Sequence, residues 1–133
     1  MSKKLDNQTI LSSLWIIVMF NMAYADILAL FIPGTHEELA RFAGGKPISL
    51  LMLGGAVILQ IPIFMIFLSR VLSHKINRWV NITVGLLMIL FVIGPEIGND
   101  AINPHYYLIA SVEVLCLLYI VWTAWQWKKA QVP

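Results

Sequence analysis

The stretch "PISLLMLGGAVILQIPIFMIFLS", residues Pro47 to Ser69, decides the fold of this chain. It carries no charged residue, and as a helix rising about 1.5 Å per residue it crosses a hydrocarbon core of about 30 Å. Three further apolar stretches of about 20 residues run over about 9–32, 79–98 and 104–127. Because backbone exposed to lipid must satisfy its own hydrogen bonds, we expect all four to be helices rather than strands.

The composition of the whole chain agrees with a bilayer as its solvent. Of 133 residues, 59% are hydrophobic and 12% are charged, whereas a soluble domain has about 25% charged residues. We therefore expect an all-α, integral membrane four-helix bundle, with one transmembrane domain over residues 1–133. The lipid bilayer is the expected partner. The net charge of +2 is too small to indicate nucleic-acid binding.

The basic residues predict the orientation of the helices. Seven of the nine flank one side of the spans: Lys3, Lys4, Arg70, Lys75, Arg78, Lys128 and Lys129. The positive-inside rule makes that side cytoplasmic, so both termini are expected inside. The first outer connection contains "THEELARFAGG", in which Thr35 and Glu38 have the spacing of a capping box and Gly44 or Gly45 ends the turn. We expect a short interfacial helix there.

A second interpretation of the first span must be weighed. The residues Ala23-Tyr24-Ala25 before Asp26 resemble a signal-peptidase site, following two lysines and an apolar run. Apolar sequence resumes at once with "ILALFIP", and the uncut run has the length of a full span. We therefore expect an uncleaved first helix. The intact mass of the purified protein separates this helix from a product that starts at Asp26.

Six polar residues interrupt the apolar spans: Asn21, Asp26, Gln60, Asn81, Glu96 and Glu113. A charge at the bilayer centre costs about 2.5–3.5 kcal/mol, so such residues normally face the bundle interior. By helical rise, Asp26 lies about 9 Å and Glu113 about 13 Å below the outer ends of their helices, with Glu96 at the outer mouth. We expect these three acids to form a site in the outer half, with Tyr24, Tyr106 and Asn99 beside them.

Helical spacing assigns these side chains to faces. Glu113 shares a face with Tyr106 and Leu117, whereas Asn81 shares one with Gly85, Met88 and Val92. Asp26 projects with Met22, and Asn21 points about 140° away. For the amides Asn21, Gln60 and Asn81 we expect helix-fastening hydrogen bonds. The pair Gly54 and Gly55 permits close contact between helices.

These features favour one function and leave others open. The leading hypothesis is a pocket for a small, partly apolar ligand or lipid, with Asp26 and Glu113 making hydrogen bonds and Tyr24 and Tyr106 forming walls. The alternatives are a proton-coupled small transporter acting as a dimer and an accessory or assembly subunit of a larger membrane redox complex. No nucleophile–base pairing, cofactor motif or spaced metal motif is visible, so we expect no cofactor and no metal, and an enzyme is the least favoured class. Acid–base isomerisation of a lipid-like substrate by the three acids stays open as an alternative.

The residues "MFNMAYADILALFIPG", Met19 to Gly34, carry a family resemblance. The chain resembles an uncharacterised family of small four-helix bacterial membrane proteins and, more loosely, the DoxX-like group. This resemblance implies a multi-pass protein of the bacterial cytoplasmic (inner) membrane. DoxX-like proteins have been linked to quinol oxidation and thiol metabolism, but the basic residue characteristic of that group near the end of the first helix is absent here.

Overall fold

The structure, a computed structural model, describes residues 5–98 and 103–128. This part of the chain forms helices and no strands: α1 Asn7–Ala29, α2 Thr35–Ala43, α3 Ile48–Val71, α4 His74–Ile93, the 3-10 turn η1 Gly94–Glu96, and α5 Pro104–Gln126. Four of these segments, α1, α3, α4 with η1, and α5, are long and apolar enough to cross a membrane. The predicted all-helical fold with four helices of spanning length is confirmed, and these four candidate spans indicate a multi-pass membrane protein.

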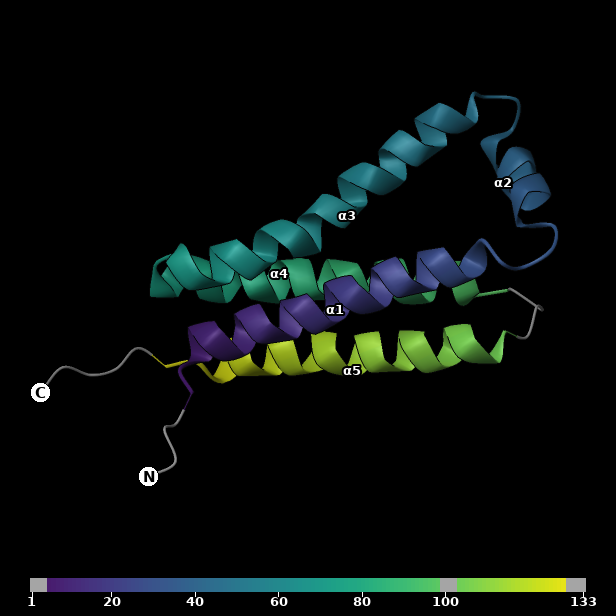
Figure 1. The fold of residues 1–133 in the computed structure, drawn as a ribbon. Coiled ribbons are helices and arrows are strands. Elements are labelled where there is room, and N and C mark those ends of the chain that lie inside the picture. The colour runs from purple at the N-terminus through teal and green to yellow at the C-terminus, as the bar shows by residue number, and fades with distance from the viewer. Residues whose placement is uncertain (1–4, 99–102, 129–133) are drawn as a thin grey trace, which may run out of the picture.

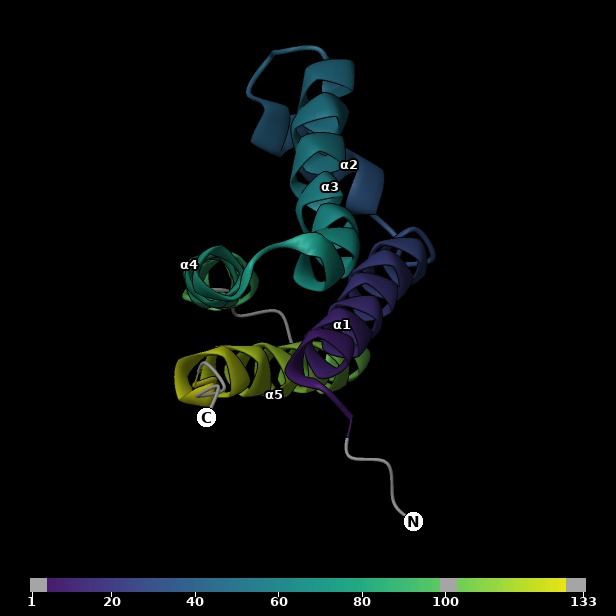
Figure 2. The same ribbon diagram turned by 90° about the vertical axis from the view of Figure 1, so that its left-hand side faces the viewer.

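Three of the long helices form a bundle, and the fourth leans away from it. Helices α1, α4 and α5 run alongside one another, with α5 in contact with both α1 and α4 (Figure 1). We call the end where α1 begins and α5 finishes the Asn7 end, and the opposite end the α2 end. Helix α3 packs on the others at the Asn7 end and diverges from them towards the α2 end, as the turned view in Figure 2 also shows.

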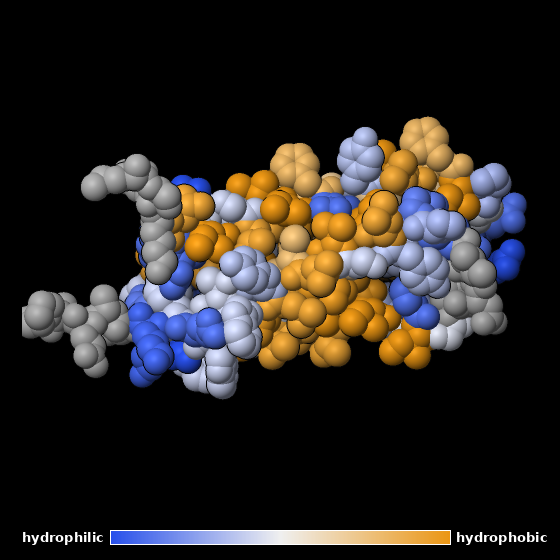
Figure 3. Space-filling model, turned by 90° about the horizontal axis from the view of Figure 1, so that it is seen from below, coloured by the Kyte–Doolittle hydropathy of each residue, from blue (hydrophilic) through white to orange (hydrophobic). Residues whose placement is uncertain are grey.

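The surface has the pattern of a membrane-spanning bundle. In Figure 3 an apolar band covers the middle of the molecule, and polar side chains gather at both of its ends. Large apolar residues of the long helices, such as Leu90, Leu108 and Leu115, are exposed. A bilayer covers such a band, since lipid tails are as apolar as leucine side chains.

The interior is built from one face of each helix. On α1 the buried face contains Leu11, Trp15, Val18 and Met22. Burial confirms the predicted interior faces of the last two spans. Helix α4 buries Asn77, Asn81, Ile82, Gly85, Met88 and Val92, and helix α5 buries Glu113, Leu117, Ile120 and Ala124. Spacings of three and four residues keep each set on one side of its helix.

The boundaries differ from the prediction at two connections. Helix α4 begins at His74 and not near 79, because the helix continues through the basic segment that we expected to be a loop. The capping box at Thr35 was also wrong. Gly34, at φ 88°, occupies the N-cap, and the Thr35 hydroxyl donates backwards to the carbonyls of Ala29 and Ile32. Gly44, at φ 59°, ends α2 as predicted.

Candidate functional site

A buried polar network joins three helices at the Asn7 end. The indole Nε1 of Trp15 on α1 donates to Oδ1 of Asn81 on α4 at 2.7 Å, and the Ser69 hydroxyl on α3 donates to the same oxygen at 3.2 Å. Asn81 Nδ2 in turn donates to Oδ1 of Asn77 at 2.7 Å. All four side chains are 0% exposed. The predicted helix-fastening role of Asn81 is therefore confirmed.

The same network extends through residues that the sequence did not single out. Asn77 Nδ2 donates to the backbone oxygen of Ser69 at 2.7 Å. Ser12 donates to the carbonyl of Ile66 at 2.8 Å and accepts from Nε of Arg70 at 2.9 Å. The predicted third span began near residue 79 and therefore excluded Asn77, although Asn77 and Asn81 lie one helical turn apart. That spacing was the signal that could have found the network.

The other two amides do not fasten helices within the described residues. Asn21 Nδ2 donates to the carbonyl of Ile17, one turn back on its own helix, at 2.9 Å. Gln60 is exposed on α3, and its side chain makes no hydrogen bond to the part of the chain that the structure describes. Neither side chain joins two helices within the described residues, and a bond from either to a second subunit stays a prediction.

Glu113 is buried without a hydrogen-bond partner. It lies on the interior face of α5, in line with Leu117 and Ile120, and is 5% exposed. Its Oε1 is the one buried side-chain nitrogen or oxygen among residues 5–98 and 103–128 that has no hydrogen-bond partner. Buried polar atoms are almost always paired in native proteins, so such an atom requires an explanation.

Asp26 and Tyr106 lie within electrostatic reach of Glu113. Tyr106, partly buried on α5 two turns before Glu113, is within electrostatic reach of Glu96, Glu113 and Asp26, and Asp26 also acts on Glu113. Among the described residues no three acidic, histidine or cysteine side chains approach closely enough to hold a metal ion. The carboxylates therefore surround a region of the bundle and do not form a compact metal centre.

The remaining predicted residues lie further from this group. Tyr24 is 61% exposed on the outside of α1, and Asn99 falls outside the described residues. Glu96 borders a groove of about 190 Å³ between α4 and α5, whose lining is Val92, Ile93, Glu96, Tyr107, Ala110, Ser111 and Val114. Glu113 is absent from that lining, since Tyr107 and Ser111 occupy a different face of α5. Glu96 therefore lies at the edge of the site.

The packing of α3 opens the bundle beside Asp26. On α1 the buried face ends at Met22, and Asp26, one turn further along the same face, is exposed. On α3 burial ends at Pro62, and the positions that continue its face towards the α2 end, Ile58 and Gly55, are not buried. Helix α3 diverges from the bundle towards the α2 end, where these positions lose their cover (Figure 1). We call this divergence between the α2 ends of α1 and α3 the opening.

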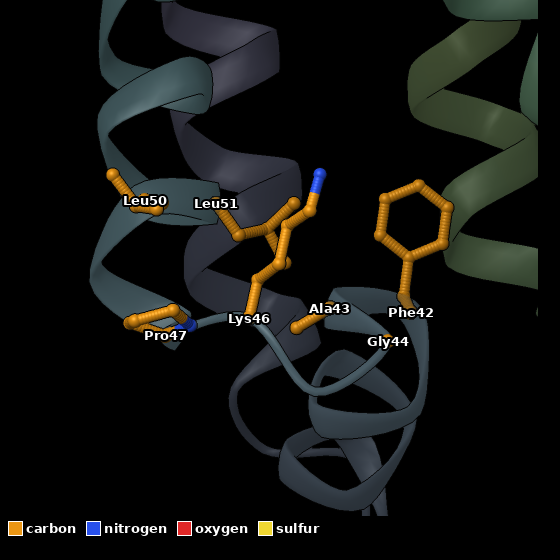
Figure 4. A pocket seen from close by; sticks show the side chains of 7 residues that line it. All are labelled: Phe42, Ala43, Gly44, Lys46, Pro47, Leu50 and Leu51. Carbon is orange, nitrogen blue, oxygen red and sulfur yellow. The ribbon is translucent and has the colours of Figure 1, made fainter.

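A larger cavity of about 550 Å³ lies at the junction of α2 and α3. Phe42, Ala43, Gly44, Lys46, Pro47, Leu50 and Leu51 line it. Figure 4 shows the ammonium of Lys46 directed into the space between Leu51 and Phe42. None of the three carboxylates belongs to this lining, so the cavity is distinct from the surroundings of Glu113.

Comparison with known proteins places the chain in a family. A model described as a family of unknown function, DUF6326, matches residues 2–133. The chain belongs to DUF6326. No curated protein and no solved structure matches it. Membership agrees with the predicted uncharacterised family and supplies no link to DoxX-like proteins, so the chemistry of this DUF6326 member must be argued from its own residues.

Those residues divide the DUF6326 interior into two polar regions of different character. At the Asn7 end, each buried amide and hydroxyl has a partner within the chain, so the network needs no ligand to satisfy it. Around Glu113, the polar groups are carboxylate oxygens, which can accept hydrogen bonds. No described side chain donates to Oε1 of Glu113. A carboxylate in apolar surroundings can bind a hydrogen-bond donor or a cation, or exchange a proton.

Proposed function

We propose that this DUF6326 protein binds a small, partly apolar ligand or lipid within the membrane, with Glu113 as the principal polar contact. The observation that carries the proposal is the buried, unpartnered Oε1 of Glu113. A buried acceptor without a partner costs about 1–3 kcal/mol, and more if it is charged. A ligand that donates a hydrogen bond to this oxygen offsets that cost.

The surroundings of Glu113 support a ligand that is polar at one end and apolar elsewhere. Asp26 and Tyr106 supply further polar contacts near Glu113, and Glu96 adds charge at the edge. The buried faces beside them are apolar, with Met22 on α1 and Met88 and Val92 on α4. Binding sites of this kind are mostly apolar, with a few polar groups that fix orientation. Tyr24 and Asn99 stay predictions from the sequence.

The position of the site in the membrane follows from the basic residues. Arg70, Lys75, Arg78 and Lys128 flank helix ends at the Asn7 end. With that end in the cytoplasm, as the positive-inside rule requires, Glu113 lies in the outer half of the bilayer. The family resemblance of Met19–Gly34 makes a bacterial inner membrane our proposal for the location.

Thermal stability of the detergent-purified protein tests this function. A panel of lipids, quinones and amphiphilic amines is added to wild type, Glu113→Gln and Asp26→Asn, with Glu37→Gln on exposed α2 as the matched control. We expect at least one compound to raise the unfolding midpoint of wild type and Glu37→Gln but not of Glu113→Gln. Equal shifts in all four proteins, or no shift in any, would overturn the proposal.

Proton-coupled transport by a dimer is the second candidate. The observation that favours it is that the charge of Asp26, which is exposed, acts on Glu113, which is buried. Such a pair can hand a proton or cation between two environments. Addition of substrate cations to weakly buffered purified protein should then release protons, and no release across a cation panel would remove this candidate.

A role as an accessory or assembly subunit of a membrane redox complex remains a third hypothesis from the sequence. Purification after mild solubilisation separates it from the first two. A stable complex with redox subunits would support it, and a monomer or homodimer alone would count against it.

A further inference from the structure

The route to Glu113 can be inferred from where burial stops. On α1 and α3 the interior faces lose their cover beyond Met22 and Pro62, on the side of the bundle towards α2. Asp26 lies at this opening on α1, and Gly55 on α3 has nothing within 4 Å of a Cβ built there. The α3 side is apolar, since Ile58 shares the face of Gly55. The opening is therefore lateral and apolar, with a carboxylate at its inner margin.

The charge around the opening selects the polar end of a ligand. The charge of Asp26 acts on Glu113, and the charges of Glu96, Glu113 and Asp26 act on Tyr106. Lys46, in the α2–α3 connection, lines the cavity at the α2 end, and none of the three carboxylates belongs to that lining. An anionic head group would face these carboxylates without a neutralising base, whereas a cation satisfies Oε1 and the local charge together.

This inference rests on the proposed function. We propose that the ligand is a cationic amphiphile, that is, an amine carried on an apolar chain. It reaches Glu113 laterally from the bilayer, between α1 and α3. The ammonium donates to Oε1 of Glu113 and lies beside Asp26. The chain occupies the apolar opening against the α2 end of α3. A lateral route also avoids the ammonium of Lys46, which a cation entering from the α2 end would meet.

Matched amphiphiles in lipid nanodiscs test the ligand class. Dodecylammonium, dodecanol and dodecanoate share one apolar chain and differ in the charge of the head group. Each is titrated into nanodiscs that hold the full chain, and the heat measured with empty discs is subtracted. We expect saturable binding of dodecylammonium, weakened about tenfold or more in Glu113→Gln because a charge-assisted hydrogen bond is lost. Glu37→Gln should bind like wild type.

The three amphiphiles separate failure of the inference from failure of the proposed function. If dodecanol or dodecanoate binds as tightly as dodecylammonium in a manner that depends on Glu113, the cationic class is overturned and the proposed site stands. If none of the three binds in a Glu113-dependent manner, and the broader panel of the thermal experiment also gives no Glu113-dependent shift, both proposals are overturned. Unfolding midpoints of the variants show that each is folded before titration.

A second pair of variants tests the lateral route. Gly55→Phe places a ring in the opening, where Gly55 has free space around its Cβ position, and Ala56→Phe places the same ring on a neighbouring exposed position that turns towards lipid. We expect Gly55→Phe to weaken dodecylammonium binding at least about tenfold, a loss of about 1.4 kcal/mol in binding free energy, and Ala56→Phe to leave it unchanged. Equal binding by both variants would overturn the lateral route.

Discussion

The indole N–H of Trp15 donates to the side-chain oxygen of Asn81 across 2.7 Å, and both residues are completely buried. This bond joins α1 to α4 at the Asn7 end, where α3 also packs. Further along the same interior, Glu113 is buried without such a partner. The bundle is thus held together by hydrogen bonds at the Asn7 end, whereas its buried carboxylate oxygen has no partner.

Removing the indole donor should loosen the Asn7 end. We expect Trp15→Phe to lower the free energy of unfolding by about 0.6–1.7 kcal/mol for the hydrogen bond alone, with lost packing in addition. Unfolding by increasing SDS in mixed micelles measures this change. Trp79→Phe is the matched control, because Trp79 is 53% exposed on α4. An equal loss in both variants would contradict the structural role of the Trp15–Asn81 bond.

Gly85 should tolerate no side chain while Val121 is present. A Cβ at Gly85 would lie 2.8 Å from Cγ2 of Val121, so Gly85→Ala should force α4 and α5 apart at a cost of about 1–3 kcal/mol. The double variant Gly85→Ala, Val121→Ala should recover part of this loss. Gly54→Ala, in open space, serves as the control. Independent, additive effects of the two substitutions would show that the helices do not meet there.

Arg78 should hold the last turn of α5. Its Nε donates to the carbonyl of Ala124 at 3.0 Å and its Nη2 to that of Trp125 at 2.9 Å, and the guanidinium lies 5.9 Å from the Trp125 ring centroid. We expect Arg78→Gln to speed hydrogen–deuterium exchange in the last turn of α5, because two terminal carbonyls lose their donors. Lys75→Gln, on an exposed side chain, should leave exchange there unchanged. Identical exchange in both variants would contradict the capping role.

The titration of the Asp6 carboxyl should reveal whether it caps the first turn of α1. Hydrogen bonding from the Thr9 side chain, together with the Thr9 backbone N–H at 3.2 Å, holds the pKa of Asp6 below its ordinary value. A carboxyl whose pKa is lowered on folding contributes stability above its unfolded pKa and loses it as the pH falls through the folded pKa. The NMR shift of the Thr9 amide should therefore titrate with a midpoint below about 3.9. Asp6→Asn should abolish the titration while keeping a cap, and a midpoint at or above about 3.9 would contradict the account.

The sequence sufficed for the parts of the structure that follow from periodicity and length. Four apolar runs of spanning length predict the four long helices, and spacings of three and four residues predict the buried faces that carry Met88 and Glu113. These properties depend on the local chain and on the bilayer, both of which composition reveals.

Properties that depend on how helices meet could not be read from the sequence. The Trp15–Asn81 bond joins residues of different helices, and nothing in either span indicates which partner faces it. Gly54 and Gly55 suggested close helix contact, yet both have open space around them and Gly85 makes the close approach. The exposure of Asp26 has the same origin, because it follows from the divergence of α3 and not from the sequence around Asp26.

Covalent modification of Glu113 tests the central claim most directly. Dicyclohexylcarbodiimide partitions into bilayers and reacts with carboxyl groups that it can reach there, and peptide mass spectrometry locates the adduct. In nanodiscs that hold wild-type protein, we predict an adduct on Glu113 whose yield falls as dodecylammonium occupies the site, while adducts on Glu37 and Glu38 of α2 do not change. A Glu113 adduct that forms equally with and without the amine, or no adduct on Glu113 at all, would contradict the claim that a ligand from the bilayer binds there.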